Sequence, residues 1–176
     1  MKIRILLITL PMLFGLLVQP HNSEAAVQKS QLLLINKKVN QVAFFENGKL
    51  IKTYPVGTGK TSKLTPEGSF FIREKIVNRP YYKLKIKGGD PRNPLGDRWM
   101  GLSANEHGSY PYGIHGTNNE RSIGKYVSGG CIRMHNKDVR ELFSRVQKGT
   151  KVVITTSRSS FAVIASPYIK KTVARK

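Results

Sequence analysis

Apolar residues in this chain fall mostly in short runs or alternate with polar residues, and both patterns are typical of β-strands. Turns rich in Gly, Asn and Pro separate these segments. Asn47-Gly48 is the clearest turn, because it supplies the positive φ angles of a tight hairpin, so the chain should open as a β-meander. We predict strands at residues 31–36, 42–46, 49–56, 69–76, 81–87, 99–102, 112–115 and 151–155.

One segment has the period of an amphipathic helix instead. Its apolar positions follow the spacing i, i+3, i+4 and i+7, at Val139, Leu142, Phe143 and Val146. Asn136 is suited to the N-cap of this helix and Gly149 to its C-terminal end. The apolar stripe should pack against the sheet. The pattern therefore predicts a mostly β fold with one packed helix near the C-terminal end.

The first residues have the organisation of an export signal. Lys2 and Arg4 form a basic start, an apolar run of 14 residues follows, and small residues come next. We interpret residues 1–25 as a signal peptide that is cut after Ala25 or Ala26. An uncleaved membrane anchor is the alternative, but the apolar run is shorter than the roughly 20 residues that a spanning helix needs.

Length and composition indicate one domain after this signal. The chain has 176 residues and is 39% hydrophobic, which suffices for a single core. We assign residues 26–156 to this domain and residues 157–176 to a basic C-terminal tail. No acidic residue follows Glu141, and no periodic pattern is evident in the tail, so we expect it to be solvated or loosely docked.

The charge of the chain is strongly positive. Its 30 Lys and Arg residues against 10 Asp and Glu give +20, which becomes +19 when Lys2, Arg4 and Glu24 leave with the signal. Inside a cell a pI near 10.3 would indicate nucleic acid, but export excludes that partner. We expect a monomer without a membrane span. Outside the cell the available polyanions are anionic cell-wall polymers, lipid headgroups and acidic polysaccharides, and salt would weaken any attraction to them. A merely well-solvated surface is the alternative.

Cys131 is the one cysteine of the chain, so internal disulfide bonds and zinc sites with two or more thiolates are excluded. It lies in the segment SGGCIR, residues 128–133, sixteen residues after His115. A catalytic thiol needs an imidazole or a positive field to lower its pKa, and His115 and Arg133 could supply both. The glycines before Cys131 would let backbone N–H groups approach a developing oxyanion. An inert buried cysteine with a structural histidine is the alternative.

Several segments together resemble the signature of the YkuD-type L,D-transpeptidases, in which His-Gly precedes Ser-x-Gly-Cys-x-Arg. The matching segments are IHGT (114–117), SGGCIRM (128–134), TPEGSF (65–70) and NPLG (93–96) followed by Trp99. The similarity spans residues 31–155, nearly all of the mature chain. It implies a mostly β, sandwich-like L,D-transpeptidase catalytic domain.

The resemblance also implies a thiol acyltransferase of peptidoglycan. Cys131 would attack the carbonyl of the third residue of a tetrapeptide stem and form a thioester, while the terminal D-alanine leaves. His115 would take the thiol proton and pass it to the leaving amine, with its ring oriented by the Gly116 carbonyl. An amine of a second stem would resolve the thioester into a cross-link. Water in its place would make the same site a carboxypeptidase.

The rest of the motif would bind the substrate and the oxyanion. Backbone amides around Gly130 and Cys131 would stabilise the oxyanion, and Ser128 would hydrogen-bond within the loop. Arg133 would hold a carboxylate or stabilise the thiolate. Many members of the family have His where this chain has Gly129, so that second imidazole is not available here.

We expect neither a metal nor another cofactor. His107 and His135 could join the cysteine and His115 in a mixed metal site, but no helix-spaced His pair or acidic ligand supports one. Tyr110 and Tyr112 fit a place in the cleft beside His115 and fit ordinary strand aromatics equally well.

Two classes of function remain after these steps. The leading hypothesis is an exported L,D-transpeptidase that acts on peptidoglycan stem peptides in the cell wall or at the outer face of the cytoplasmic membrane. Its rival is a non-catalytic basic protein that coats anionic wall polymer, with Cys131 buried and inert.

Overall fold

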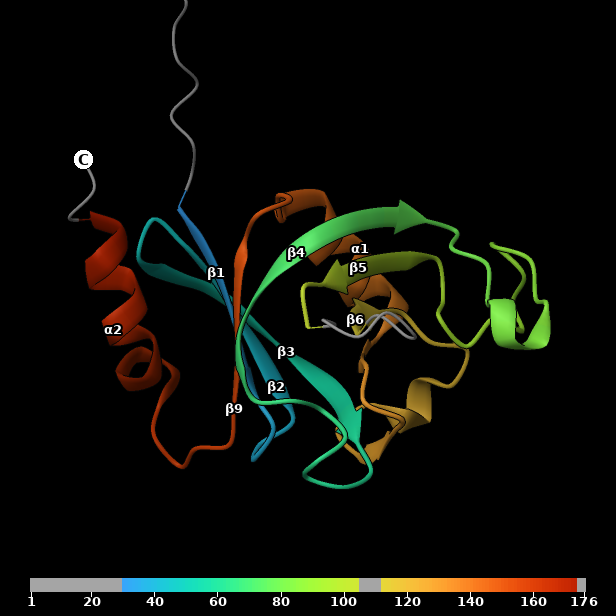
Figure 1. The fold of residues 1–176 in the computed structure, drawn as a ribbon, viewed down its shortest axis with the longest axis horizontal. Helices are drawn as coiled ribbons and strands as arrows, with labels where there is room; N and C mark the ends of the chain where they lie inside the picture. The colour runs from blue at the N-terminus through green and yellow to red at the C-terminus, as the bar shows by residue number, and fades with distance from the viewer. Residues whose placement is uncertain (1–29, 105–111, 174–176) are drawn as a thin grey trace, which may run out of the picture.

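The computed structural model describes residues 30–104 and 112–173, and its centre is one strongly curved sheet (Figure 1). Its strands are β1 (Gln31–Asn36), β2 (Gln41–Glu46), β3 (Lys49–Gly59), β4 (Gly68–Val77), β5 (Arg98–Leu102), β6 (Gly113–His115), β7 (Tyr126–Ser128), β8 (Ile132–Met134) and β9 (Lys151–Thr155). Their order is β2-β1-β9-β4-β5-β6-β8-β3-β7, and β2 also pairs with β3, so the sheet closes on itself. The predicted mostly β, sandwich-like domain is confirmed, with a barrel-like closure.

Strand β1 separates two apolar clusters. Leu33 and Ile35 belong to the main core inside the curved sheet, whereas Leu32 and Leu34 face a second cluster on the other side. Successive side chains of a strand point to opposite faces, so a strand that is covered on both faces has a continuous apolar run. The continuous run LLLI in β1 therefore indicates that another element covers the outer face, where Leu32 and Leu34 lie.

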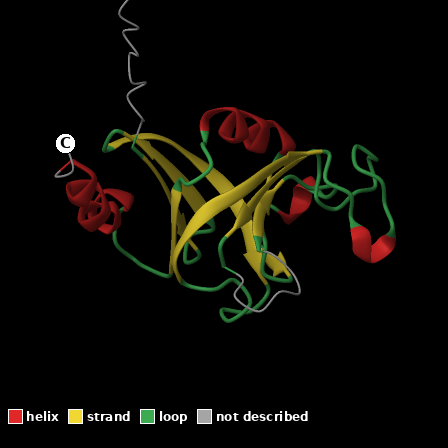
Figure 2. Cartoon of the chain, turned by 45° about the horizontal axis from the view of Figure 1, so that its top comes forward, coloured by secondary structure: helices red, strands yellow, loops and turns green. Residues whose placement is uncertain are grey.

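That cover is α2 (Phe161–Val173), and it corrects the expected basic tail over residues 157–176. Figure 2 shows this helix on the outer side of the sheet, away from α1 (Asn136–Arg145). Ala165 is fully buried on the second cluster, and Phe161, Ile164 and Tyr168 pack beside it. Neither helix in the described part of the chain is long and apolar enough to cross a membrane.

Pro167 lies inside α2, where it cannot donate the hydrogen bond of a helical N–H. The Ser166 hydroxyl donates to the Val163 carbonyl at 2.9 Å, which is the carbonyl that residue 167 would otherwise bond. This side-chain bond compensates for the proline. Apolar residues at positions 161, 164, 165 and 168 then supply the packing that holds the helix in place.

The segment 81–87 does not form the predicted strand. It contains a 3₁₀ turn, η1 (Tyr82–Leu84), and a single bridge joins Tyr81 to Ile86. Lys85 ends the turn in the left-handed region with φ 52°, and Tyr82 is 71% exposed. The segment protrudes from the sheet, at the right of Figure 1, so the alternation of apolar and basic residues does not reflect pairing on a sheet.

Helix α1 packs against the sheet as predicted, but its ends differ from the prediction. The N-cap is His135 rather than Asn136, and the helix ends at Arg145, before Gly149. Gly149, with φ 83°, instead turns the chain into β9, and its N–H donates to the Ile72 carbonyl at 2.8 Å. The short strands β7 and β8, which flank the glycine-rich turn before Cys131, were not predicted.

Candidate active site

Parallel pairing of β6 with β8 brings the predicted histidine and cysteine together. Ile114 pairs with Ile132 and His115 with Arg133, so Cys131, directly before β8, lies at the level of Gly113. The Gly113 backbone N–H acts on the cysteine sulfur and lowers the pKa of the thiol. Two residues that are sixteen positions apart in the sequence thus lie on neighbouring strands of one sheet.

His115 is buried and has a fixed tautomer. Its Nδ1 lies 2.6 Å from the Gly116 carbonyl oxygen, as the resemblance implied. A carbonyl only accepts hydrogen bonds, so Nδ1 carries the proton and Nε2 is the unprotonated nitrogen of the neutral ring. Burial lowers the pKa of His115 to about 4, and the charges of Arg133 and Arg79 lower it further, against the opposing effect of the Gly116 and Leu95 carbonyls. The ring is therefore a neutral imidazole that can accept a proton at Nε2.

Burial dominates the environment of Cys131 too. It raises the pKa of the thiol, while the Gly113 N–H and the charges of Arg133 and Arg79 act in the opposite direction. The charge of Arg133 lowers the pKa of both Cys131 and His115. The resting site consequently holds a thiol beside a neutral imidazole.

Trp99 and Arg79 form one wall of this site. The Trp99 ring stacks on the His115 ring with centroids 5.5 Å apart, and its indole N–H donates to Glu74 at 2.8 Å. The Arg79 guanidinium lies 4.4 Å from the indole centroid. A Cβ atom at Gly113 would lie 2.5 Å from the indole, so only glycine leaves room for it. The sequence analysis missed Arg79, because no local motif marks it.

The loop before Cys131 is held by its own hydrogen bonds. The Ser128 hydroxyl donates to the Cys131 carbonyl at 2.6 Å and accepts from the Gly130 N–H at 3.0 Å. The Gly130 N–H, which was expected to face an oxyanion, is therefore engaged within the loop. Gly130 has φ 132°, and a Cβ there would lie 2.5 Å from the Leu64 carbonyl oxygen and 2.6 Å from the Tyr112 ring. Tyr112 thus lies against this loop, beside the cysteine.

Gly129 differs from Gly130 in its surroundings. It is exposed, and a Cβ at this position would meet nothing within 4 Å. Many family members have His at this position; among the residues that the structure describes in this chain, no other group fills the space that its side chain would enter.

Asn136 has a role that the sequence analysis did not find. Its Oδ1 accepts from the Thr117 N–H at 3.0 Å, and its Nδ2 donates to the Thr117 carbonyl at 2.7 Å. Its Oδ1 would lie 2.2 Å from a Cβ at Gly116. The side chain thereby holds the segment whose Gly116 carbonyl orients His115.

The other candidates for metal binding do not converge. His135 hydrogen-bonds to Glu120, whose carboxylate also accepts from the Asn136 N–H at 3.2 Å. His107 and Tyr110 lie outside the described residues. Within residues 30–104 and 112–173, no group of three His, Cys, Asp or Glu side chains could hold a metal ion.

Comparisons with known proteins agree on one family. The sequence model of the YkuD family, described as an L,D-transpeptidase catalytic domain, matches residues 30–154. YqjB of Bacillus subtilis, whose name assigns it to the L,D-transpeptidases, is 49% identical over 133 residues, which are 76% of this chain and 76% of that protein. YkuD of Bacillus licheniformis, named in the same way, is 50% identical over 111 residues, covering 63% of this chain and 57% of that protein.

Solved structures show the same fold at lower identity. An L,D-transpeptidase from Stackebrandtia nassauensis has a TM-score of 0.58 at 21% identity, with 74% of this chain and 58% of that chain covered. L,D-transpeptidase 3 from Mycobacterium tuberculosis, in complex with a faropenem-derived adduct, has a TM-score of 0.56 at 16% identity, with 72% and 60% covered. This chain spans little more than half the length of these proteins.

Proposed function

This chain belongs to the YkuD family of L,D-transpeptidase catalytic domains, and we propose on that basis that it cross-links peptidoglycan stem peptides with Cys131 as its nucleophile. The observation that carries the proposal is the His115 Nδ1 contact with the Gly116 carbonyl. It leaves Nε2 as the basic nitrogen, on the strand that pairs with the start of β8. A base in a fixed tautomer beside a thiol is the arrangement that thiol acyl transfer requires.

Acylation begins from the neutral pair. As the Cys131 sulfur attacks the carbonyl carbon of the third stem residue, its proton passes to Nε2 of His115. Arg133 and Arg79 favour the thiolate and disfavour the imidazolium, since they lower the pKa of both groups. The imidazolium therefore gives its proton readily to the leaving amine. The S–C bond has then formed, the C–N bond to the terminal D-alanine has broken, and a thioester remains.

In the second half of the reaction the proton moves in the opposite direction, from the attacking amine through His115 to the sulfur. The side-chain amine of a diamino acid on a second stem attacks the thioester, its proton passes through His115, and the thiol is restored as the cross-link forms. Water in place of the amine would yield a tripeptide stem, which is the carboxypeptidase alternative. The half-buried position of Cys131 favours the amine, because partial exclusion of water slows hydrolysis of a reactive intermediate.

Oxyanion stabilisation in this chain should rest on the backbone. The Gly130 N–H is bonded to Ser128, and position 129 has no imidazole to contribute. The N–H of Cys131 itself is the donor that we expect to face the developing oxyanion. Arg133 remains available to bind a carboxylate of the stem.

A mass measurement tests the nucleophile. We expect one covalent adduct on the wild type after incubation with a carbapenem or a penem, and none on Cys131→Ala. The faropenem-derived adduct on the M. tuberculosis protein of the same fold makes this probe suitable. An unmodified Cys131 would favour the non-catalytic wall-binding protein instead. With a tetrapeptide stem as substrate, cross-linked dimers indicate the transpeptidase, and tripeptide alone indicates the carboxypeptidase.

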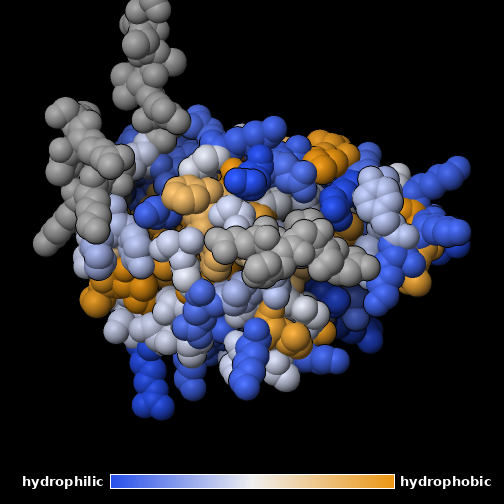
Figure 3. All heavy atoms as spheres, viewed as in Figure 1, coloured by the Kyte–Doolittle hydropathy of each residue, from blue (hydrophilic) through white to orange (hydrophobic). Residues whose placement is uncertain are grey.

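The place of action is part of the same proposal. Residues 1–25, interpreted as an export signal, lie outside the described residues, so the support for a place in the wall is the pattern of the sequence. Figure 3 shows hydrophilic side chains spread over the visible face, with only small apolar patches between them. Such a surface, with the net charge of +19 that remains after removal of Lys2, Arg4 and Glu24, suits attraction to anionic wall polymers. Binding to purified wall that does not weaken with added salt would contradict this part.

A further inference from the structure

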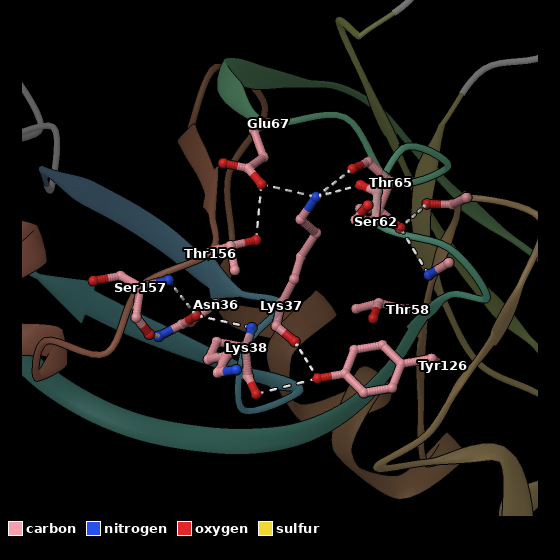
Figure 4. Close-up of polar contacts among 12 residues, drawn as sticks. Asn36, Lys37, Lys38, Thr58, Ser62, Thr65, Glu67, Tyr126, Thr156 and Ser157 are labelled. Carbon is pink, nitrogen blue, oxygen red and sulfur yellow. Dashed lines mark hydrogen bonds and ion pairs between the residues drawn. The ribbon is translucent and has the colours of Figure 1, made fainter.

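Lys37, outside the active site, is a buried lysine with a full set of partners (Figure 4). Its side chain is 7% exposed. The ammonium donates to the carbonyls of Ser62 at 2.7 Å and Thr65 at 2.9 Å, and it lies 3.0 Å from a Glu67 carboxylate oxygen. An ammonium has three donors, so these three acceptors satisfy it. A charge is buried in this way only where its partners are held in fixed positions.

All three acceptors belong to one segment between β3 and β4. Lys37 follows β1, so its side chain ties the turn after that strand to the loop that contains residues 62–67. Glu67 is fixed from the other side as well, because the Thr156 hydroxyl donates to it at 2.8 Å. The loop is thereby held by residues that follow β1 and β9, two neighbouring strands of the sheet.

Thr65 connects this loop to the residue before the nucleophile. Its hydroxyl is buried, donates to the Gly130 carbonyl at 2.8 Å and accepts from the Gly59 N–H at 2.9 Å. The Leu64 carbonyl also packs closely against Gly130, as the lack of space for a Cβ there shows. The segment held by Lys37 therefore both bonds to and packs against Gly130.

The hydrogen bond from Thr65 to the Gly130 carbonyl fixes the whole peptide unit between Gly130 and Cys131. A peptide unit is planar and trans, so the C=O of residue 130 and the N–H of residue 131 lie in one plane and point in opposite directions. A hydrogen bond that fixes the Gly130 carbonyl therefore also fixes the direction of the Cys131 N–H. This N–H is the donor that the proposed function assigns to the oxyanion.

We infer that Thr65 and Lys37 are positioning residues for catalysis: Lys37 fixes the loop, and Thr65 aims the Cys131 N–H through the Gly130 carbonyl. The inference rests on the proposed function. It concerns two residues that touch neither the substrate nor the thiol. It also gives the threonine of the TPEG segment a defined task in this chain.

The test compares two reactions of the same sulfur in the full mature chain. Acylation by a penem passes through an oxyanion, whereas alkylation by iodoacetamide does not. We expect Thr65→Val to slow acylation about 100-fold, the typical effect of losing an oxyanion donor, and to change alkylation by less than about threefold. Thr65→Ser keeps the hydroxyl and should restore most of the acylation rate.

Lys37→Met and Lys38→Met form the matched comparison, since the Lys38 side chain is exposed next to the buried one. Lys37→Met should slow acylation by a smaller factor than Thr65→Val, and Lys38→Met should leave it unchanged. Acylation of Thr65→Val at the wild-type rate would overturn the inference. An equal loss of acylation and alkylation would overturn it too, because it would indicate a general disturbance of the loop.

A wild type that is not acylated would refute the proposed function, and the inference would then be decided by the NMR amide resonance of Cys131. That resonance should move in Thr65→Val and Lys37→Met well beyond any change in Thr65→Ser and Lys38→Met. An unmoved resonance in Thr65→Val would show that Thr65 does not orient this peptide.

Discussion

The side-chain amide of Asn136 bonds to both backbone groups of Thr117, at 3.0 Å to the N–H and 2.7 Å to the carbonyl. This contact joins the first residue of α1 to the segment that follows β6. Thr117 is two residues after His115 in the sequence. The orientation of the His115 ring thus depends on a helix that begins about twenty residues later in the chain.

Asn136→Asp should impair both stability and acyl transfer. The carboxylate keeps the acceptor for the Thr117 N–H but places a negative oxygen against the Thr117 carbonyl, so we expect a loss of about 1–3 kcal/mol in the free energy of unfolding. The acylation rate should fall as the Gly116 carbonyl shifts. Denaturant titration and penem acylation measure the two effects. The exposed neighbour Lys137→Ala serves as the control, and equal behaviour of the two variants would contradict the role of Asn136.

Gly130→Ala and Gly129→Ala should behave very differently although the residues are adjacent. At position 130 the methyl group meets the Leu64 carbonyl and the backbone has φ 132°, so we expect a loss of about 2–4 kcal/mol in stability and of most acylation. At position 129 the methyl group meets nothing, and stability should change by less than about 0.5 kcal/mol. Thermal or denaturant unfolding of both variants decides the comparison. A tolerant position 130 would mean that the loop has another conformation in solution.

Much of the fold follows from local pattern, and the exceptions have physical causes. β1 and β2 are short continuous apolar runs, and α1 has the helical period of Val139, Leu142 and Val146, so their buried residues could be predicted locally. The apolar positions 161, 164, 165 and 168 of α2 do have a helical period, which the sequence analysis missed. Pro167 interrupts the hydrogen bonds of this helix, and the Ser166 bond and packing on the outer face of β1 stabilise it. The alternation in 81–87 is real, yet no strand lies beside that segment.

Some residues of the site could likewise be predicted from the sequence, and others could not. An ordered motif marks Cys131 and His115, and the resemblance to the family implied the Gly116 carbonyl, which contacts the His115 ring in the structure. Arg79 and Asn136 could not be predicted, since each acts through contacts between segments far apart in the sequence. A sequence indicates which side chains have the right chemistry, but the fold decides which charge or amide reaches them.

The packing of α2 predicts a contrast between two alanines. Ala165 is fully buried against the second cluster, whereas Ala162 is exposed. Ala165→Glu should lower the free energy of unfolding by about 2–4 kcal/mol through a buried, unpaired charge, and Ala162→Glu should change it by less than about 0.5 kcal/mol. Denaturant unfolding of both variants is the measurement. Similar stabilities would mean that the helix is not docked on β1.

The depressed pKa of His115 predicts a specific dependence of stability on pH. The histidine titrates near 6.5 in the unfolded chain and near 4 in the folded one, so between these values only the unfolded chain takes up the proton. The contribution of the neutral ring is complete above pH 6.5 and is lost as the pH falls toward 4, by at most about 1.4 kcal/mol per pH unit. His115→Gln should show a shallower decline in urea titrations over this range. An unchanged slope would contradict the burial of a neutral ring.

Arg79 predicts a shift in the reactivity of the thiol. Its charge lowers the pKa of both Cys131 and His115, so Arg79→Met should raise both. The pH at which Cys131 becomes half-reactive toward iodoacetamide should move upward, and the rate at a given pH below that midpoint should fall because less thiolate is present. Arg92→Met removes a charge that is largely exposed and paired with Asp90, and it should leave the profile unchanged. Since both variants lose one positive charge, a shift of equal size in both would assign the effect to net charge. A shift in Arg79→Met alone would assign it to the guanidinium that lies over Trp99, the ring that stacks on His115.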